Sequence, residues 1–287
     1  MRCNKVKLII LLLVSQSYAT FAQTKTSSLL WEISGNGISH PSYLYGTIHL
    51  IDQKDFLIRK EIDSVFNLAE QIAFEIKMDD ATALSKIEAW FPLPEGKTFQ
   101  DYCSPAEYEK IKNYLMDSME TDIKQFNDQK PFVVAQLQMS DYIEGEMASY
   151  ELYFMTKAMS LQKPMKGLEL IEEQLNLFDM IPYEEQIDWI VEGIDSASHY
   201  SITWSQLIEA YKNEDLTALW RLFIETTPEL VKYEPILISN RNKNWIPVIE
   251  EMIKTTSTFI AVGAGHLPGE MGVIELLIKQ GYSLRPL

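Results

Sequence analysis

Cysteine and basic residues are both scarce in this sequence. Of the two cysteines in 287 residues, Cys3 lies in an N-terminal segment that we expect to be removed, so Cys103 has no partner for an intramolecular disulfide. In "DYCSPAEY", Cys103 stands before Ser104, which can cap a helix, and we expect an inert thiol there. Lys and Arg number 25 against 41 Asp and Glu, a formal net charge of −16, which argues against binding nucleic acid or anionic lipid.

A long hydrophobic run is also lacking. The apolar stretch Leu8–Val14 is too short to span a bilayer, and it follows three basic residues and precedes the small-x-small sequence of Thr20–Ala22. Residues 1–22 therefore form a predicted cleavable signal peptide, whose loss removes three positive charges and takes the net charge from −16 to −19. We expect an exported protein, periplasmic or secreted, with no stable membrane insertion after cleavage.

Several well-known catalytic motifs are absent. The sequence contains no H-E-x-x-H, Walker A, G-x-S-x-G or paired C-x-x-C pattern. The segment "GAGHLPG" follows a predicted strand as a dinucleotide-binding turn would, but it is spaced G-x-G-x-x-x-G. Only 18 residues follow it, too few for the second half of such a unit. A nucleotide cofactor is therefore not expected.

Hydrophobic periodicity predicts an α/β fold with strands at both ends of the chain and helices between them. Because a strand, a helix and another strand follow one another near residue 70, some of the strands should be parallel. The simplest account of residues 23–287 is one α/β domain with a central mixed sheet built from N- and C-terminal βα units. Strands are expected at 29–34, 42–46, 71–76, 163–169 and within 258–287, a helix at 57–69, a helical insertion over about 80–160 and a helical region over about 170–254.

Two of the four histidines occur in the same local setting. His49 in "YLYGTIHL" and His266 in "AVGAGHLP" each follow a predicted strand and stand three residues after a glycine. Open α/β sheets place ligands at the carboxyl ends of their strands, and glycine permits a close backbone approach there. Two imidazoles at one edge are half of a divalent-metal site. The alternative is that each histidine only caps a turn.

Carboxylates and an arginine could complete such a site. Glu75 in "AFEIK" interrupts an apolar strand that we expect beside the His49 strand, where an ionised side chain is unfavourable unless it is paired or binds metal. Glu169 in "GLELIEEQ" ends another strand, and either glutamate could be a ligand or a general base. Alternatively, Glu169 caps the next helix. Arg241 in "ISNRNKNW" could orient a carboxylate or bind substrate, or could be an ordinary surface residue.

The order of these segments resembles the TraB/GumN family, to which the Tiki proteases are related. The resemblance covers about residues 28–287, and its most specific parts are the two G-x-x-H motifs and the GLE-x-x-x-x-Q segment. It implies a fold similar to that of the erythromycin-esterase and ChaN-like proteins, and a metal-dependent peptidase activity. By position it puts His49, Glu75 and His266 at a divalent metal ion, Mn, Co or Zn, with Glu169 and Arg241 as supporting catalytic residues.

The function expected from these features is that of an exported metal-dependent hydrolase, a peptidase acting on a peptide or another small-molecule substrate. In a second hypothesis, the same residues bind a ligand without catalysing a reaction. In it, the protein is a periplasmic binding protein that holds a peptide, a signalling molecule or a haem-like ligand in the same cleft.

Overall fold

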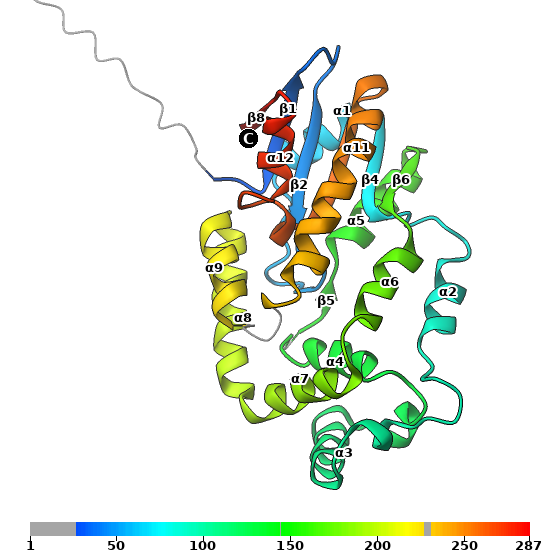
Figure 1. Ribbon diagram of the computed structural model, residues 1–287. Coiled ribbons are helices and arrows are strands. Elements are labelled where there is room, and N and C mark those ends of the chain that lie inside the picture. Colours follow the sequence, from blue (N-terminus) through cyan, green and yellow to red (C-terminus); the bar gives the residue numbers. More distant parts are fainter. Residues whose placement is uncertain (1–26, 144, 227–230) are drawn as a thin grey trace, which may run out of the picture.

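The computed structural model describes residues 27–143, 145–226 and 231–287 (Figure 1). The predicted signal peptide, residues 1–22, lies outside the described residues. In the part that is described, no helix has both the length and the apolar character needed to cross a bilayer.

A six-stranded mixed sheet forms the centre of the molecule, in the order β6-β4-β7-β2-β1-β8. Strands β6, β4, β7 and β2 are parallel neighbours, while β1 pairs antiparallel with both β2 and β8. The expected α/β class and mixed sheet are thus confirmed. The strands are β1 Leu30–Gly35, β2 Ser42–Thr47, β4 Gln71–Ile76, β6 Met165–Glu169, β7 Thr258–Gly263 and β8 Tyr282–Pro286.

The expected position of the Glu75 strand is wrong in one respect. Strand β4 runs parallel to β2, as the βαβ pattern predicts, but it pairs with β7 and β6 and not with β2. The C-terminal strand β7 lies between β2 and β4, and Phe259 to Val262 are buried on both of its faces, as is typical of a central parallel strand covered by helices. The correction places the two histidine strands directly side by side.

Helices cover both faces of the sheet (Figure 1). The connections β2-α1-β4 and β4-α5-β6 run one way across the sheet, whereas β6-α11-β7 and β7-α12-β8 run the other way. Since parallel crossovers are right-handed, α1 and α5 take one face and α11 and α12 the other. These helices are α1 Lys60–Leu68, α5 Tyr150–Ser160, α11 Asn240–Thr255 and α12 Val273–Lys279.

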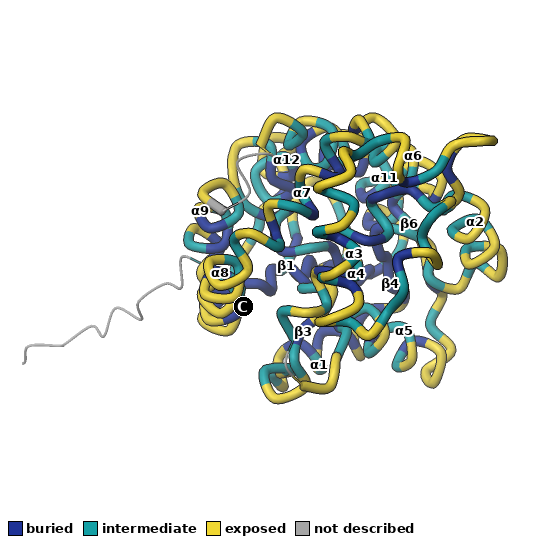
Figure 2. Tube along the Cα trace, turned by 90° about the horizontal axis from the view of Figure 1, so that it is seen from below, coloured by how far each residue is buried: buried dark blue, intermediate teal, exposed yellow. Residues whose placement is uncertain are grey.

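The remaining helices extend beyond the strands' carboxyl ends. Part of them forms a helical lobe around α3, α4 and α7, with a hydrophobic cluster separate from that of the sheet. Figure 2 shows buried segments gathered along the strands and exposed ones on the outer helical turns. These helices are α2 Ala83–Trp90, α3 Pro105–Met119, α4 Pro131–Ser140, α6 Ile171–Asp179, α7 Tyr183–Asp195, α8 Ala197–Lys212 and α9 Leu216–Thr226, with 3-10 turns at η1 Phe99–Tyr102 and η2 Ile123–Phe126.

Ser104 caps α3 as expected, accepting a hydrogen bond from the Glu107 amide at 3.3 Å. Burial and the neighbouring Glu107 carboxylate raise the pKa of Cys103 to about 11. Little thiolate therefore forms near neutral pH, which agrees with an inert thiol.

A small second sheet, which the sequence pattern did not predict, joins the segment after β2 to the segment before α5. Strand β3, Ile51–Asp52, pairs antiparallel with β5, Met147–Ala148. Because β3 follows the His49 loop and β5 precedes α5, this pairing brings the first turn of α5 beside the end of β2.

The glycine of the first G-x-x-H motif is required by close packing. A Cβ added to Gly46 would lie 2.7 Å from Leu267 Cδ1 and 3.1 Å from the Cα of Ala264, whereas one added to Gly265 would meet nothing within 4 Å. Gly46 therefore permits the two motif segments to approach each other.

Gly46→Ala should lower the free energy of unfolding by about 1–3 kcal/mol, because the Ala264 backbone must move to relieve the overlap. Gly265→Ala is the matched control, and its effect should be neutral or stabilising by up to about 1 kcal/mol. Urea denaturation of both variants measures the difference. Equal stability of the two variants would contradict the packing role of Gly46.

Candidate functional site

The polar residues singled out in the sequence meet at one edge of the sheet. Strands β2, β4, β6 and β7 all end there, with Thr47 opposite Gly263 and Ile76 opposite Glu169 in the strand register. The two histidines follow β2 and β7, and the two glutamates lie at the ends of β4 and β6. Arg241 approaches from the first turn of α11.

His266 is buried and held in one tautomer. It ends the 3-10 turn η4, Ala264–His266, and its Nδ1 lies 2.6 Å from Oδ1 of Asn242. The Asn242 amide nitrogen donates to the carbonyls of His266 and Met271, so Oδ1 is the atom that faces the ring. Nδ1 must therefore carry the proton, which leaves the lone pair on Nε2. Burial lowers the pKa of His266 to about 3, so the ring stays neutral.

His49 has the same orientation but a different environment. Its Nδ1 lies 3.0 Å from Oε1 of Glu151 at the start of α5, so Nδ1 donates and Nε2 is directed away from Glu151. The side chain is 67% exposed. Loss of hydration acts to lower the pKa of His49, but the hydrogen bond to Glu151 and the charge of Glu75 outweigh it and raise the pKa.

Glu75 is a buried carboxylate with a partner on each oxygen. Its Oε1 accepts from the Gly263 amide at 2.8 Å and lies 3.8 Å from His266 Nε2. Its Oε2 accepts from Arg241 at 2.6 Å and from the Gln174 amide at 3.0 Å. Burial alone would raise the pKa of Glu75, but the charges of Arg241 and His49 and the hydrogen bond from the Gly263 amide hold it well below its ordinary value. The carboxylate is therefore ionised.

Arg241 joins both carboxylates to a histidine. Its Nη2 donates at 2.6 Å to Glu75 and at 2.6 Å to Glu169, and its Nε donates to both oxygens of Glu169. Its Nη1 lies 3.1 Å from His266 Nε2. A π-helical turn, η3 Pro235–Ser239, leads into α11, and the Leu237 carbonyl in it accepts from Nη1. Arg241 is thus a buried residue that orients two carboxylates and is not a surface arginine.

Glu169 is more fully bound than the sequence suggested. Besides Arg241, it accepts from the indole of Trp245 at 3.1 Å and from the Gln174 amide at 3.2 Å. It does not cap α6, since Glu173 accepts from the amide of Leu170 there. Trp245 also stacks against Arg241 and His266, with the guanidinium 4.8 Å and the imidazole 4.5 Å from its ring centre.

The two histidines and Glu75 converge on Gly263. A Cβ placed on Gly263 would lie 3.3 Å from Glu75 Oε1, 3.7 Å from His49 Nε2 and 3.6 Å from His266 Cδ2. Two imidazoles and one carboxylate are donor types that suit Zn²⁺ and similar ions. His49 Nε2 lies near Gly263, and His266 Nε2 lies 3.8 Å from Glu75 Oε1. Because the pKa of His49 is raised, this ring must lose a proton before it can bind a metal ion. The residues present thus fit a divalent ion in their donor types.

The arrangement is not a closed metal cluster. Across the described ranges, no three His, Cys, Asp or Glu side chains are already spaced as metal ligands, and Arg241 Nη1 lies 3.1 Å from His266 Nε2. Binding an ion would require the three side chains to approach one another and Arg241 to give up its contact with His266. The other two histidines are elsewhere, His40 in the β1–β2 turn and His199 exposed on α8.

Three further residues of this site were missed by sequence reasoning. Glu151 is a first-turn acid like many others, and nothing in its neighbourhood marks it. Asn242 stands next to Arg241 in the sequence. Its role is visible only in the structure, where it is buried and contacts His266. Gln174 is the glutamine of the GLE-x-x-x-x-Q segment, so a motif did point to it, but its contacts with two carboxylates depend on the tertiary structure.

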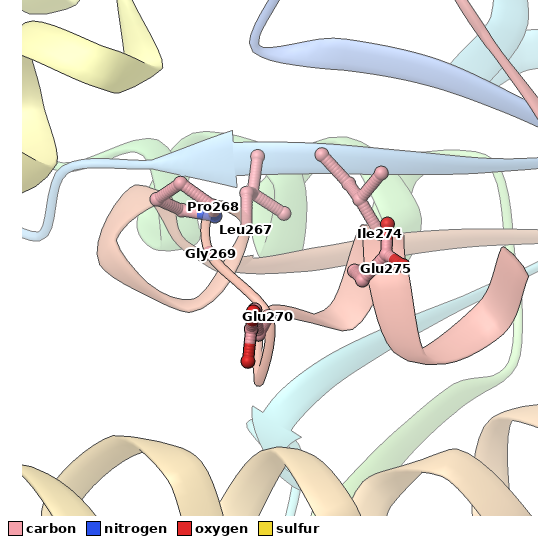
Figure 3. A pocket seen from close by; sticks show the side chains of 6 residues that line it. All are labelled: Leu267, Pro268, Gly269, Glu270, Ile274 and Glu275. Atoms are coloured by element: carbon pink, nitrogen blue, oxygen red, sulfur yellow. The ribbon is translucent and has the colours of Figure 1, made fainter. Parts of the chain in front are cut away.

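A shallow cavity of about 250 Å³ lies just beyond His266 in the chain. Figure 3 shows its lining, which consists of Leu267, Pro268, Gly269 and Ile274 together with the acidic residues Glu270 and Glu275. It contains none of the polar residues that meet at the sheet edge. The candidate site is therefore defined by its side-chain chemistry and not by this cavity.

Replacing Arg241 with Met should destabilise the fold by about 3–5 kcal/mol at neutral pH, because two buried carboxylates would lose their common cation. The loss should shrink as the pH falls toward 5, since the unpaired glutamates can then be protonated. Urea unfolding at several pH values measures this.

The matched control is Arg285→Met, which breaks an exposed pair with Glu32 at 3.0 Å. That change should lower the free energy of unfolding by about 1 kcal/mol or less. Similar losses for the two variants would show that Arg241 does not hold the buried carboxylates.

The chain is similar to known proteins over most of its length. Residues 29–286 match the profile of the TraB/PrgY/gumN family. Metalloprotease TIKI1 of Danio rerio is 24% identical over 91% of the chain, the Metalloprotease TIKI homolog of Amphimedon queenslandica 21% over 98%, and Metalloprotease TIKI1 of Xenopus tropicalis 25% over 91%. The alignments span 63%, 66% and 62% of those proteins, less than two thirds of their length.

No solved structure matches the chain significantly. The family match covers most of the sequence and includes every residue of the site described above. The chain belongs to the TraB/PrgY/gumN family.

Proposed function

We propose that this protein is a metal-dependent hydrolase that cleaves peptide bonds outside the cytoplasm. The observation that carries the proposal is the matched arrangement of two imidazoles, each with Nδ1 hydrogen-bonded to a side-chain oxygen and each beside Glu75 and Gly263. The names of the relatives, all Tiki metalloproteases, support the peptidase class. The predicted signal peptide supports export.

His49, His266 and Glu75 would hold the ion, with Mn, Co and Zn as candidates. When bound, a divalent ion supplies a Lewis acid that polarises a carbonyl and lowers the pKa of water. The protein keeps the donor atoms of His266 and Glu75 in the protonation state that metal binding requires. Asn242 keeps the His266 proton on Nδ1, and the Gly263 amide and Arg241 keep Glu75 ionised.

Glu169 and Arg241 have a supporting role in this proposal. All strong acceptor positions of Glu169 are used by Arg241, Trp245 and Gln174, so Glu169 is better suited to hold the guanidinium than to accept a proton. Arg241 Nη1 lies at the edge of the site beside His266 Nε2. The positive charge of Arg241 in that position can stabilise negative charge that develops on a carbonyl oxygen of the substrate.

His49→Ala and His266→Ala should each abolish stoichiometric binding of Mn, Co or Zn, because each removes one of three donors. His199→Ala, a change at an exposed histidine on α8, is the matched control and should bind metal like the unchanged protein. Elemental analysis after dialysis gives the occupancy. Full occupancy in both site variants would refute the proposed ligands.

Turnover of a peptide library by the metal-loaded protein then tests the hydrolase itself. Products that disappear in both site variants but persist in His199→Ala support a peptidase. Tight capture of a peptide or a haem-like ligand with no product would instead support the binding protein considered from the sequence.

A further inference from the structure

His49 is the less firmly held of the two imidazoles. It follows β2 in a loop, outside any helix or strand, and two thirds of its side chain is exposed. His266 is by contrast buried between Trp245, Asn242 and Arg241. An exposed side chain loses more conformational freedom on binding a ligand unless another group already fixes it.

Glu151 supplies that fixing contact from a distant part of the chain. Its Oε1 accepts from His49 Nδ1 at 3.0 Å and also from the hydroxyl of Thr47 at 2.6 Å. Its Oε2 accepts from Ser149, which caps α5. Both carboxylate oxygens are therefore oriented, and the carboxylate lies at a helix N-terminus, where negative charge is favoured. The side chain is only 16% exposed.

The two G-x-x-H motifs differ at the position that contacts Glu151. The residue after the glycine is Thr47 in the first motif and Ala264 in the second. Thr47 can donate to Glu151, whereas Ala264 has no donor and the second histidine is oriented by Asn242 from α11. The first motif is therefore hydrogen-bonded to α5 through Thr47, and it is also the motif that contains the exposed histidine, His49.

We propose that Glu151 is the positioning residue for His49, holding its ring with Nε2 toward Glu75 through the Thr47–Glu151–His49 hydrogen bonds. This inference rests on the proposed function, since it assigns a role toward the ion that His49 would bind. Glu151 is not a ligand itself, because its two oxygens are directed at Nδ1, Thr47 and Ser149 and not at Gly263. Carboxylates that hold a metal-binding histidine through its second nitrogen strengthen binding by about 10- to 100-fold.

The test compares Glu151→Ala, Glu151→Gln and Thr47→Val with Glu184→Ala. Glu184 is the matched control, because it is an exposed acid that also follows a tyrosine at the second position of a helix, α7. Co²⁺ affinity is measured by titration calorimetry, and folding by circular dichroism. Glu151→Ala should bind Co²⁺ about 10- to 100-fold more weakly than Glu184→Ala. Glu151→Gln keeps an acceptor for Nδ1 and should lose less, as should Thr47→Val.

A second readout does not depend on metal. Nitrogen NMR of the metal-free protein, at a pH where His49 is neutral, reports which ring nitrogen carries the proton. The proton should be on Nδ1 in the unchanged protein and in Glu184→Ala, and this preference should be lost in Glu151→Ala. If Glu151→Ala does not fold, Glu151→Gln and Thr47→Val carry both measurements.

Unchanged Co²⁺ affinity in the folded Glu151 variants would overturn the inference. If the unchanged protein binds none of Co²⁺, Mn²⁺ and Zn²⁺, the proposed function fails, and the NMR measurement decides the positioning role by itself. An Nδ1 proton that persists on His49 without Glu151 would then overturn it.

Discussion

The ion-pair network around Arg241 is the interaction on which the rest of the site depends. Two carboxylates, Glu75 and Glu169, are almost fully buried at the edge of the sheet and would repel each other without a shared cation. Arg241 donates hydrogen bonds to both carboxylates, and Gln174 and Trp245 donate to acceptor positions that remain. This network also ties α11 and α6 to the ends of β4 and β6, so the charge arrangement and the fold support each other.

The strand order gives the network its position. Because β7 lies between β2 and β4, the segments after β2 and β7 are neighbours, and the carboxylate of β4 faces the amide of Gly263. Gly46 and Gly263 then leave room for close approach, the first to Ala264 and the second to three polar side chains. Polar groups from segments more than 200 residues apart in sequence are thereby gathered within a few ångströms of one another.

The two histidines are oriented in the same way by partners of different charge. Asn242 is neutral and fixes a buried ring, whereas Glu151 is ionised and fixes an exposed one. A carboxylate partner makes an imidazole a more basic ligand than an amide partner does. The site thus combines one buried, neutral imidazole with one exposed imidazole.

The sequence by itself determined the elements of this protein and the identity of most groups in its site. Period-two and period-3.6 patterns predicted the hairpin, the strands with Glu75 and Glu169, and the helical middle, because local hydrophobic patterning reflects which face is buried. The repeated glycine–histidine spacing identified His49 and His266, and burial of a charge in an apolar strand identified Glu75. Only the tertiary structure decided that β7 separates β2 from β4, since strand order depends on long-range packing that local pattern does not encode. It alone also identified Glu151, Asn242 and the β3–β5 pairing, because a first-turn acid or a helical asparagine becomes a positioning group only through the partner that folding brings within hydrogen-bond distance.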